Sequence, residues 1–212
     1  MSAVFSWPKI RRGQRVNVVG PSGSGKTELL KTLLRTQQNA IVVDTKRVED
    51  WSNVGEIIGP KDVYRIRGGR FVYRVEEDFL VNPELPERFF RWALRNKNRT
   101  IAIDEQLDIP NCPGEKILAT QGRASGVGLW VATQRPHGVP LYTLSEANHT
   151  FVFRLRIDRD RDRIETLTGA KIDWEALKPE FSFVYISANG DVSHPAKLLL
   201  EGQGEPKTSA KA

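Results

Sequence analysis

Apolar residues follow two different patterns that alternate from one segment of the chain to the next. Short continuous or alternating runs of β-branched residues predict strands, and most of these runs are separated by segments with helical spacing of apolar residues. Strands and helices that alternate in this way predict an α/β fold with a mainly parallel central sheet and helices on both of its faces. Strands are expected at 15–19, 40–44, 100–104, 129–133 and 150–155, and helices at 26–36, 86–95, 115–123, 141–147, 160–167 and 174–177.

The C-terminal part of the chain has the pattern of a β-hairpin. Two runs, at 181–187 and 192–200, flank the sequence Ala-Asn-Gly-Asp at 188–191. Asn-Gly is favoured in two-residue hairpin turns, whose central residues take positive φ. An antiparallel pair is therefore expected to close the sheet. Asp173, which precedes the short helical segment at 174–177, is a candidate N-cap.

The length of the chain fits one sizeable domain. The 212 residues begin with a short basic stretch at 1–13 and end with a small, polar stretch at 201–212, and both stretches are expected to be tails. A single domain at 14–200 remains. No apolar run reaches the roughly 18 residues of a membrane-spanning helix, and the N-terminus has no signal-peptide core, so a cytoplasmic protein is expected.

The net charge indicates the kind of partner, and the cysteine content excludes two kinds of structural cross-link. Lys and Arg together number 32 against 26 Asp and Glu, a net charge of +6, which favours a polyanionic partner. The single cysteine, Cys112, excludes an internal disulfide and a Cys/His metal cluster.

A second hairpin is predicted from the sequence VYRIRGGRFVYR at 63–74. Two alternating runs meet at a Gly-Gly pair, and the resulting register places four arginines on one face. Like charges that face each other destabilise a hairpin, and a phosphate backbone would relieve the repulsion. Arg65, Arg67 and Arg70 are therefore candidates to line a DNA path. The alternative is an edge hairpin whose arginines keep it soluble and unpaired.

The sequence GPSGSGKT lies between a predicted strand and a predicted helix. In a G-x-x-x-x-G-K-T loop, glycines let backbone N–H groups converge on phosphate oxygens at the positive N-terminus of the helix. Lys26 would reach the β and γ phosphates of ATP, and the Thr27 hydroxyl would hold Mg²⁺. The nucleotide-binding residues are therefore Gly20, Pro21, Ser22, Gly23, Ser24, Gly25, Lys26 and Thr27.

The strand TIAIDE ends in two carboxylates at the same sheet edge as this loop. Asp104 is placed to hold Mg²⁺ and Glu105 to orient the attacking water, which indicates ATP hydrolysis. The 78 residues from Lys26 to Asp104 leave room for the strand at 40–44 between the two motifs, a layout typical of hydrolytic motor ATPases.

A third motif, GLWVATQRP at 128–136, places polar residues at the end of another buried strand. Gln134 could sense the γ phosphate or the attacking water by hydrogen bonding. The alternative for such a residue, taken alone, is a simple polar end to the strand.

Five segments in order resemble the FtsK/HerA superfamily of ring-forming, DNA-pumping ATPases over roughly residues 14–170. They are GPSGSGKTELLKTLL, IVVDTKRVED with its D-x-K, TIAIDEQLDI, QGRASGVGLWVATQRP and EANHTFVFRLRIDRDRDRIETLTGA. This resemblance implies a P-loop NTPase fold of the RecA/ASCE type. It also implies a homo-oligomeric ring, a hexamer or a pentamer, in which Arg123 acts on the nucleotide of a neighbouring subunit. Without the resemblance, Arg123 would be read as an exposed residue in the last turn of a helix.

The chain has no room for the membrane anchor, DNA-orienting domain or β-barrel of larger relatives. It most resembles viral and phage genome-packaging ATPases, which implies double-stranded DNA and a capsid or portal vertex protein as partners, in the host cytoplasm or on the virion. Two alternatives remain: a DNA translocase of a mobile element or conjugation system, and an assembly or secretion ATPase acting on protein. Nucleotide kinases and transporter-type ATPases fit less well, because the acidic pair is not needed by the former and the latter carry an LSGGQ-like signature that the sequence lacks.

Overall fold

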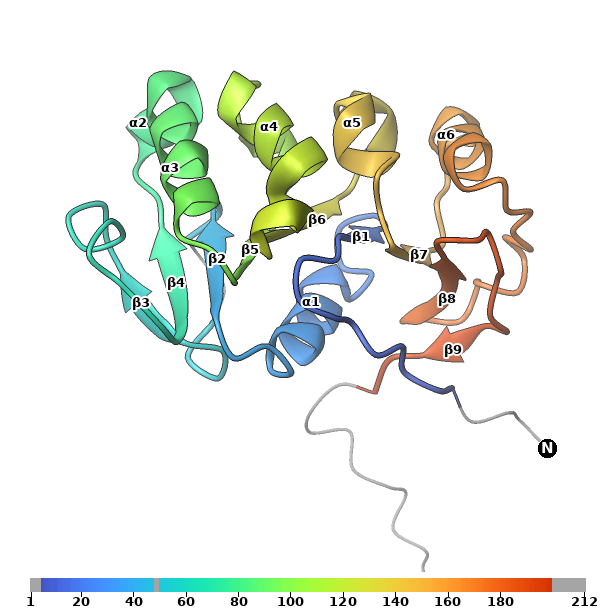
Figure 1. Ribbon diagram of the computed structural model, residues 1–212. Helices are drawn as coiled ribbons and strands as arrows, with labels where there is room; N and C mark the ends of the chain where they lie inside the picture. The colour runs from blue at the N-terminus through green and yellow to red at the C-terminus, as the bar shows by residue number, and fades with distance from the viewer. Residues whose placement is uncertain (1–4, 48–49, 200–212) are drawn as a thin grey trace, which may run out of the picture.

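The computed structural model describes residues 5–47 and 50–199. Its centre is a nine-stranded sheet in the order β3-β4-β2-β5-β6-β1-β7-β8-β9, shown in Figure 1. Neighbouring strands from β3 to β7 are parallel, whereas the β7/β8 and β8/β9 pairs are antiparallel. The predicted α/β fold, with a parallel sheet and an antiparallel C-terminal end, is confirmed.

The strands are β1 Val16–Val19, β2 Ala40–Asp44, β3 Glu56–Ile58, β4 Arg70–Arg74, β5 Thr100–Ile103, β6 Gly128–Thr133, β7 His149–Phe153, β8 Ser182–Ser187 and β9 Ala196–Lys197. The helices are α1 Lys26–Leu34, α2 Glu77–Val81, α3 Glu84–Arg95, α4 Pro113–Gln121, α5 Leu141–Leu144 and α6 Asp158–Thr168. Short 3-10 turns at Gln106–Asp108, Gly122–Ser125 and Pro136–Gly138 lie between them. No helix in the described part of the chain is both long and apolar enough to cross a bilayer.

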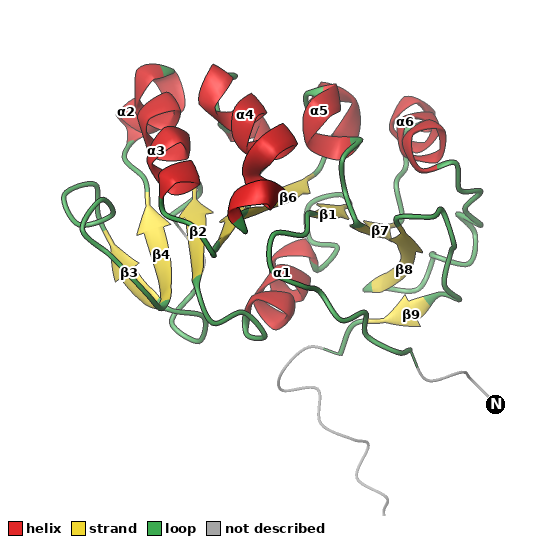
Figure 2. Ribbon diagram, viewed as in Figure 1, coloured by secondary structure: helices red, strands yellow, loops and turns green. Residues whose placement is uncertain are grey.

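Helices cover both faces of the sheet, but unequally. Figure 2 shows α2 to α6 on one face, with α1 and the N-terminal segment on the other. Every residue of β2 is buried, as expected for a strand covered on both sides. Ile41 and Val43 pack in the core beneath α3 and α4, and Val42 packs in the core against α1. The central strands are thus packed on both faces, and their carboxyl ends lie along one edge of the sheet.

The strand between the phosphate-loop strand β1 and the acidic strand β5 is β6. Val16 of β1 pairs with Trp130 of β6, and Thr100 of β5 pairs with Gly128 of β6. The strand at 40–44 lies on the far side of β5, so it precedes β5 in sequence without separating β5 from β1 in space.

The N-terminal segment packs against the sheet over its described part. The Phe5 ring lies 5.3 Å from the ring of Phe183 in an edge-on contact, and the Trp7 ring lies 6.0 Å from the same ring. Residues 5–13 of the expected tail at 1–13 form no helix or strand, and the side chains of Phe5 and Ile10 pack against the core. Residues 1–4 and the predicted C-terminal tail at 201–212 lie outside the described residues.

Two predicted elements near the C-terminus differ from expectation: one is not a helix and the other is a shorter strand. Residues 174–177 form a turn, not a helix, although Asp173 Oδ1 accepts hydrogen bonds from the backbone N–H groups of Glu175 and Ala176 as a cap would. Pro179 follows at once and disfavours helical continuation. In the described part of the predicted strand at 192–200, the pairing is reduced to one bridge at Val192 and the two residues of β9, and Leu200 lies outside the described residues. Pro195, between them, has no N–H to donate to the ladder.

The predicted hairpin at 63–74 is wrong. Only its second half is a strand, and this strand, β4, pairs in parallel with β2 on one side and β3 on the other. With both sides of β4 occupied, residues 63–67 cannot pair with it as the hairpin would require. They form a turn in which Val63 is fully buried and the Tyr64 ring packs edge-on against Trp92 at 5.6 Å. The apolar residues of this segment are used for packing under α3.

Candidate active site

The loop between β1 and α1 has a conformation that only glycine accommodates easily. Gly23 and Gly25 have φ of 74° and 99°, in the left-handed region. A Cβ on Gly20 would lie 2.7 Å from Cβ of Phe153, closer than real carbon contacts. The Gly20 N–H donates to the Thr133 carbonyl at 3.1 Å, which ties the loop to the end of β6. The backbone can therefore curve around an anion at the start of α1.

Lys26 is held at the base of this loop. Its side chain is 5% exposed and its Nζ donates to the Pro21 carbonyl at 2.9 Å. Burial lowers the pKa of Lys26 to about 8; the carboxylates of Glu105 and Asp104 oppose this change, and the ammonium of Lys46 adds to it. An incoming phosphate would supply the counter-charge that this buried ammonium needs.

Thr27 and Asp104 meet across the site. The Thr27 hydroxyl donates to Asp104 Oδ1 at 2.9 Å, and Asp104 is fully buried. A hydroxyl and a carboxylate at this separation are the hard oxygen donors that Mg²⁺ prefers, so the residues fit the ion. No group of three or more His, Cys, Asp or Glu within the described ranges could hold a metal on its own. Mg²⁺ would therefore also need oxygens from the nucleotide and water.

Glu105 lies beside this pair at the end of β5. It is 3% exposed, and its Oε1 accepts a hydrogen bond from the backbone N–H of Gln134 at 3.3 Å. Its Oε2 is buried and has no hydrogen-bond partner among the described residues. That oxygen is available to accept a proton from a water molecule. The structure thus brings Gln134 next to Glu105, although through the backbone N–H and not the side-chain amide.

Lys46, which follows β2, is a second cation in the site besides Lys26. Asp44 is fully buried and accepts hydrogen bonds from Arg74 Nε at 2.9 Å and from the Arg47 N–H at 3.0 Å. These contacts fix the D-x-K segment so that Lys46 Nζ lies 3.9 Å from Asp104 Oδ2. Lys46 therefore belongs to the site as a neighbour of the expected metal ligand.

A buried carboxylate that the sequence did not lead us to expect lies behind Glu105. Glu115 of α4 has no exposed surface, and its Oε1 accepts hydrogen bonds from Gln106 Nε2 at 3.1 Å and Thr143 Oγ1 at 3.0 Å. Burial raises the pKa of Glu115 to about 7. The network joins α4 and α5 to the residue that follows Glu105. In the sequence, a Glu in the first turn of a helix resembles an ordinary exposed residue that favours the dipole.

Arg123 does not lie with these residues. It is exposed in the 3-10 turn just before β6, whereas the phosphate loop follows the carboxyl end of β1. Since β6 and β1 are parallel and paired in register, Arg123 and the phosphate loop lie at opposite edges of the sheet. Arg123 therefore cannot serve the nucleotide site of its own chain.

Of the three arginines predicted to line a DNA path, Arg70 is engaged within the chain. Its Nε donates to the Val54 carbonyl at 2.8 Å, and its Nη1 lies 3.4 Å from the carbonyls of Arg35 and Gln37. Those contacts fasten the start of β4 to the neighbouring loops. Arg70 is therefore a poor candidate for DNA contact.

Arg65 and Arg67 remain exposed at the amino edge of the sheet. They line an open hollow of about 810 Å³ together with Arg95 and Lys97, and no acidic residue lines it. None of these four cations forms an ion pair within the described part of the chain. We call these four residues the amino-edge basic surface.

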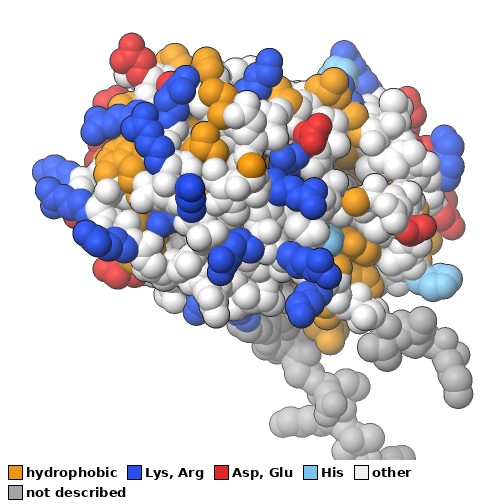
Figure 3. Space-filling model, viewed as in Figure 1, with side chains coloured by type: hydrophobic (Ala, Val, Ile, Leu, Met, Phe, Trp, Pro, Cys, Tyr) orange, Lys and Arg blue, Asp and Glu red, His pale blue; other side chains and the backbone are white. Residues whose placement is uncertain are grey.

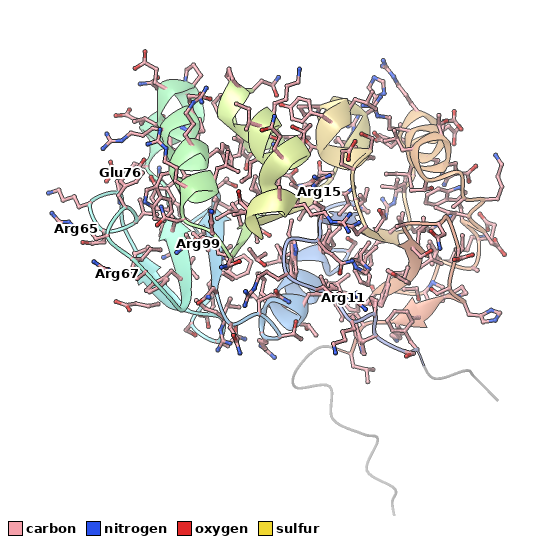
Figure 4. The ribbon with its side chains drawn as sticks, viewed as in Figure 1. Arg11, Arg15, Arg65, Arg67, Glu76 and Arg99 are labelled. Atoms are coloured by element: carbon pink, nitrogen blue, oxygen red, sulfur yellow. The ribbon has the colours of Figure 1, made fainter. Side chains whose placement is uncertain are left out.

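Arg99 is a buried arginine that lines the same hollow and holds the backbone of Arg67 in place. It is 7% exposed, donates to the carbonyls of Asn96 and Arg67, and stacks on Trp92 at 5.2 Å. Figure 4 shows Arg65, Arg67 and Arg99 on the same side of the molecule, with Arg11 and Arg15 further along the sheet. In Figure 3 Lys and Arg spread over the left and centre of this face, and acidic side chains lie mostly at its margin.

The phosphate loop, the Thr27–Asp104 pair and the buried Glu105 together define a P-loop ATPase domain. Residues 8–132 match the sequence model of the family described as ABC transporter, which is more than half of the chain, and the chain belongs to this family of ATPases. The matched region runs from before β1 into β6 and so contains the nucleotide-handling motifs. No curated protein matches the chain in sequence.

Solved structures extend the likeness over nearly the whole chain. The genome-packaging NTPase B204 of Sulfolobus turreted icosahedral virus 2 is 19% identical with a TM-score of 0.73, covering 91% of this chain and 100% of B204. The pCW3 conjugation coupling protein TcpA is 15% identical with a TM-score of 0.57, covering 87% of this chain and 60% of TcpA. EssC (ATPases 2 and 3) from Geobacillus thermodenitrificans is 12% identical with a TM-score of 0.60, covering 91% and 41%. The resemblance to FtsK/HerA-type ATPases is thereby confirmed at the level of fold.

Proposed function

We propose that this chain is a Mg²⁺-dependent ATPase that moves double-stranded DNA as a homo-oligomeric ring, and that it packages a viral genome. The observation that carries the proposal is the separation of Arg123 from the complete phosphate and water-activating site at the other edge of the sheet. A head-to-tail ring joins two different surfaces of neighbouring subunits, and we propose that the amino edge of one subunit faces the carboxyl edge of the next, so that Arg123 completes a neighbour's site. A trans-acting arginine stabilises charge on the departing γ phosphoryl group.

Each residue at the carboxyl edge has a role in this proposal. Lys26 and the loop backbone hold the phosphates, and Glu105 orients the attacking water through its free Oε2. Gln134 fixes the other oxygen of Glu105 by its backbone N–H and could contact the γ phosphate with its amide. Bound Mg²⁺ would supply neutralisation of the phosphate charge, held by Thr27 and Asp104.

Double-stranded DNA is the proposed substrate for two reasons. The whole-chain fold is shared with B204, described as a DNA-packaging ATPase and solved with ATP-γS, and with a conjugation coupling protein. In addition, the amino-edge basic surface presents cations that form no ion pair among the described residues and that fit a phosphate backbone of any sequence. A capsid or portal vertex protein, in the host cytoplasm or on the virion, would receive the DNA.

Hydrolysis with and without DNA tests the proposal. The rate of ATP hydrolysis is expected to rise when double-stranded DNA is added, and the rise should shrink as salt increases. Glu105→Gln provides the background, since its hydrolysis should be strongly slowed with and without DNA. A rate unchanged by DNA at every salt concentration would instead favour an assembly or secretion ATPase acting on protein, for which EssC has a comparable fold.

Mixing two inactive variants tests the shared site. Arg123→Ala subunits retain an intact phosphate loop, and Lys26→Ala subunits retain the arginine. Mixed rings should recover part of the hydrolysis rate, because some sites would combine an intact loop with a neighbour's intact Arg123. If no mixing ratio restores hydrolysis, Arg123 does not act between subunits.

A further inference from the structure

Gln106 and Glu115, two buried side chains that meet behind Glu105, each keep one oxygen without a hydrogen-bond partner. Gln106 is 2% exposed, and Glu115, in the first turn of α4, has no exposed surface. Gln106 Nε2 donates to Glu115 Oε1 at 3.1 Å. Gln106 Oε1 and Glu115 Oε2 are buried, and neither has a partner among the described residues. Buried polar atoms are ordinarily hydrogen-bonded, so these two oxygens require a physical reason.

A proton on Glu115 would give both oxygens a partner. A neutral carboxyl group and a primary amide are complementary, because the amide N–H donates to one carboxyl oxygen and the carboxyl O–H donates to the amide oxygen. The first of these bonds is present, and the second would join the two oxygens that lack a partner. An ionised Glu115 would offer the Gln106 oxygen only another acceptor. Burial raises the pKa of Glu115 to about 7, which agrees with a neutral carboxyl group below that pH.

The direction of the Glu105 carboxylate depends on the backbone that carries it. The side chain accepts one hydrogen bond, from the Gln134 N–H at 3.3 Å, and its Oε2 has no partner among the described residues. Glu105 directly precedes the 3-10 turn Gln106–Asp108. The side chain of Gln106 fastens this turn to α4 through Glu115, so the pair of buried side chains holds the segment that carries Glu105.

Glu115 is itself fixed from a second helix. Thr143 Oγ1 of α5 donates to Glu115 Oε1 at 3.0 Å, and α4 and α5 are neighbours on one face of the sheet in Figure 1. We propose that Glu115, as a neutral acid, is a positioning residue for ATP hydrolysis: it holds Gln106 by two hydrogen bonds and so fixes the direction of Glu105. The inference rests on the proposed role of Glu105 in orienting the attacking water.

The groups around Glu115 keep their charge where Glu115 changes its own. The titratable groups that face it are Cys112 before α4, Glu87 of α3, Tyr142 of α5, and Glu105 and Asp108 on either side of Gln106. Burial raises the pKa of the Cys112 thiol to about 11 and also raises the pKa of Tyr142, so both stay neutral below pH 9. Burial raises the pKa of Glu87 as well, but hydrogen bonds from the Gly114 N–H and from Arg91 outweigh it, so the pKa is lowered and Glu87 stays ionised.

The pH profile of ATP hydrolysis by the full chain with Mg²⁺ tests the role of Glu115. Glu115→Gln is always neutral and presents one N–H and one C=O, so it can form both hydrogen bonds with Gln106 at every pH. From pH 6 to pH 8, kcat of the unaltered chain should fall about tenfold relative to kcat of Glu115→Gln, because the protonated fraction of Glu115 falls by that factor. The surrounding groups are the same in both chains, so the difference reports Glu115. KM for ATP should differ by less than about twofold.

Further variants separate positioning from stability. Glu115→Leu cannot bond to Gln106, so its kcat at pH 6 should fall about tenfold with little change in KM. Gln106→Leu should remove the pH difference, because Glu115 then has no amide to hold. Glu77→Gln, an exposed position at the start of α2, is the matched control and should keep the pH profile of the unaltered chain. The stoichiometry of ATP binding gives the folded fraction of each preparation, so kcat is calculated for folded protein alone.

The outcomes that overturn the inference are distinct from those that overturn the role of Glu105. Equal pH profiles for the unaltered chain and Glu115→Gln would show that the charge of Glu115 does not affect Glu105. A pH difference that persists in Gln106→Leu would show that Glu115 does not act through Gln106. Both results leave Glu105 in its role if Glu105→Gln is slow. If Glu105→Gln hydrolyses ATP at the unaltered rate, the role of Glu105 fails and the inference fails with it. The near-isosteric Glu115→Gln decides the matter even if Glu115→Leu does not fold.

Discussion

The two edges of the sheet carry charge in opposite ways. At the carboxyl edge, Lys26, Asp104 and Glu105 are buried and lie in fixed hydrogen-bonded positions. At the amino edge, Arg65 and Arg67 are exposed and form no ion pair among the described residues. Buried, oriented charge suits one small ligand in one geometry, because the groups need no rearrangement at the moment of reaction. Exposed cations suit a long polyanion, whose contacts can be numerous and independent of sequence.

The largest expected effect is at the carboxyl edge. Glu105→Gln should slow ATP hydrolysis by roughly 10²- to 10⁴-fold, because the amide cannot accept the proton of the attacking water. Nucleotide affinity should change little, and this is checked by measuring turnover and ATP binding on the same preparation. Glu77→Gln, an exposed position at the start of α2, is the matched control. A turnover loss below tenfold would remove Glu105 from its role.

The second prediction concerns the buried carboxylate behind the site. The pKa of Glu115 rises from 4.5 to about 7 on folding, so the folded protein holds the proton more tightly than the unfolded chain. The stabilisation is complete below about pH 4.5 and is lost as pH rises through about 7, a change of about 3 kcal/mol in the free energy of unfolding.

Urea unfolding at pH 5 and pH 7.5 measures this loss directly. Glu115→Gln carries no titrating proton and should flatten the dependence, with Glu77→Gln again as the exposed control. A variant that keeps the same difference in stability between the two pH values would show that other groups are responsible.

The third prediction concerns the amino edge. Changing Arg67 and Lys97 together to Glu should weaken binding of double-stranded DNA by at least about tenfold and reduce the steepness of its salt dependence. ATP hydrolysis without DNA should remain within about twofold, because both residues lie at the edge away from the nucleotide. DNA affinity would be measured by fluorescence anisotropy at several salt concentrations.

The matched control replaces Lys116 and Arg159, two exposed cations outside the amino-edge basic surface, with Glu. Equal losses in the two double variants would mean that net charge and not this surface determines binding. Arg70→Ala gives a further contrast, since it should reduce stability and leave DNA affinity nearly unchanged.

The smallest expected effect is at Lys46. Replacing it with Gln removes a cation that lies 3.9 Å from Asp104, on the side where the γ phosphate would lie. ATP binding should weaken roughly fivefold and ADP binding less, because ADP has no γ phosphate to attract. Competition with a fluorescent nucleotide would compare the two, and Lys116→Gln is the control. Equal weakening of ATP and ADP would place Lys46 away from the γ position.

Local motifs and spatial neighbours differ in how well they could be predicted. The strand order could not be read from the sequence, and β6 rather than β2 separates β1 from β5. The hairpin at 63–74 failed for a related reason. Apolar and polar residues do alternate in this segment. However, β4 pairs in parallel with a strand on each side, and Val63 is buried in the core. The local pattern of apolar and polar residues does not indicate which strands will pair with each side of a given strand.

The sequence by itself determined the phosphate loop, the acidic pair after β5 and the α/β class. These features depend on glycine conformations, strand–helix order and residues adjacent in the chain, all of which are local. Only the tertiary structure decided that Arg70 is engaged within the chain, that Arg65 forms no ion pair with any described residue, and that Glu115 lies behind Glu105. It also placed Arg123 at the edge opposite the loop. Those outcomes depend on burial and on partners distant in sequence, because packing of the sheet and helices determines which polar groups lose contact with water.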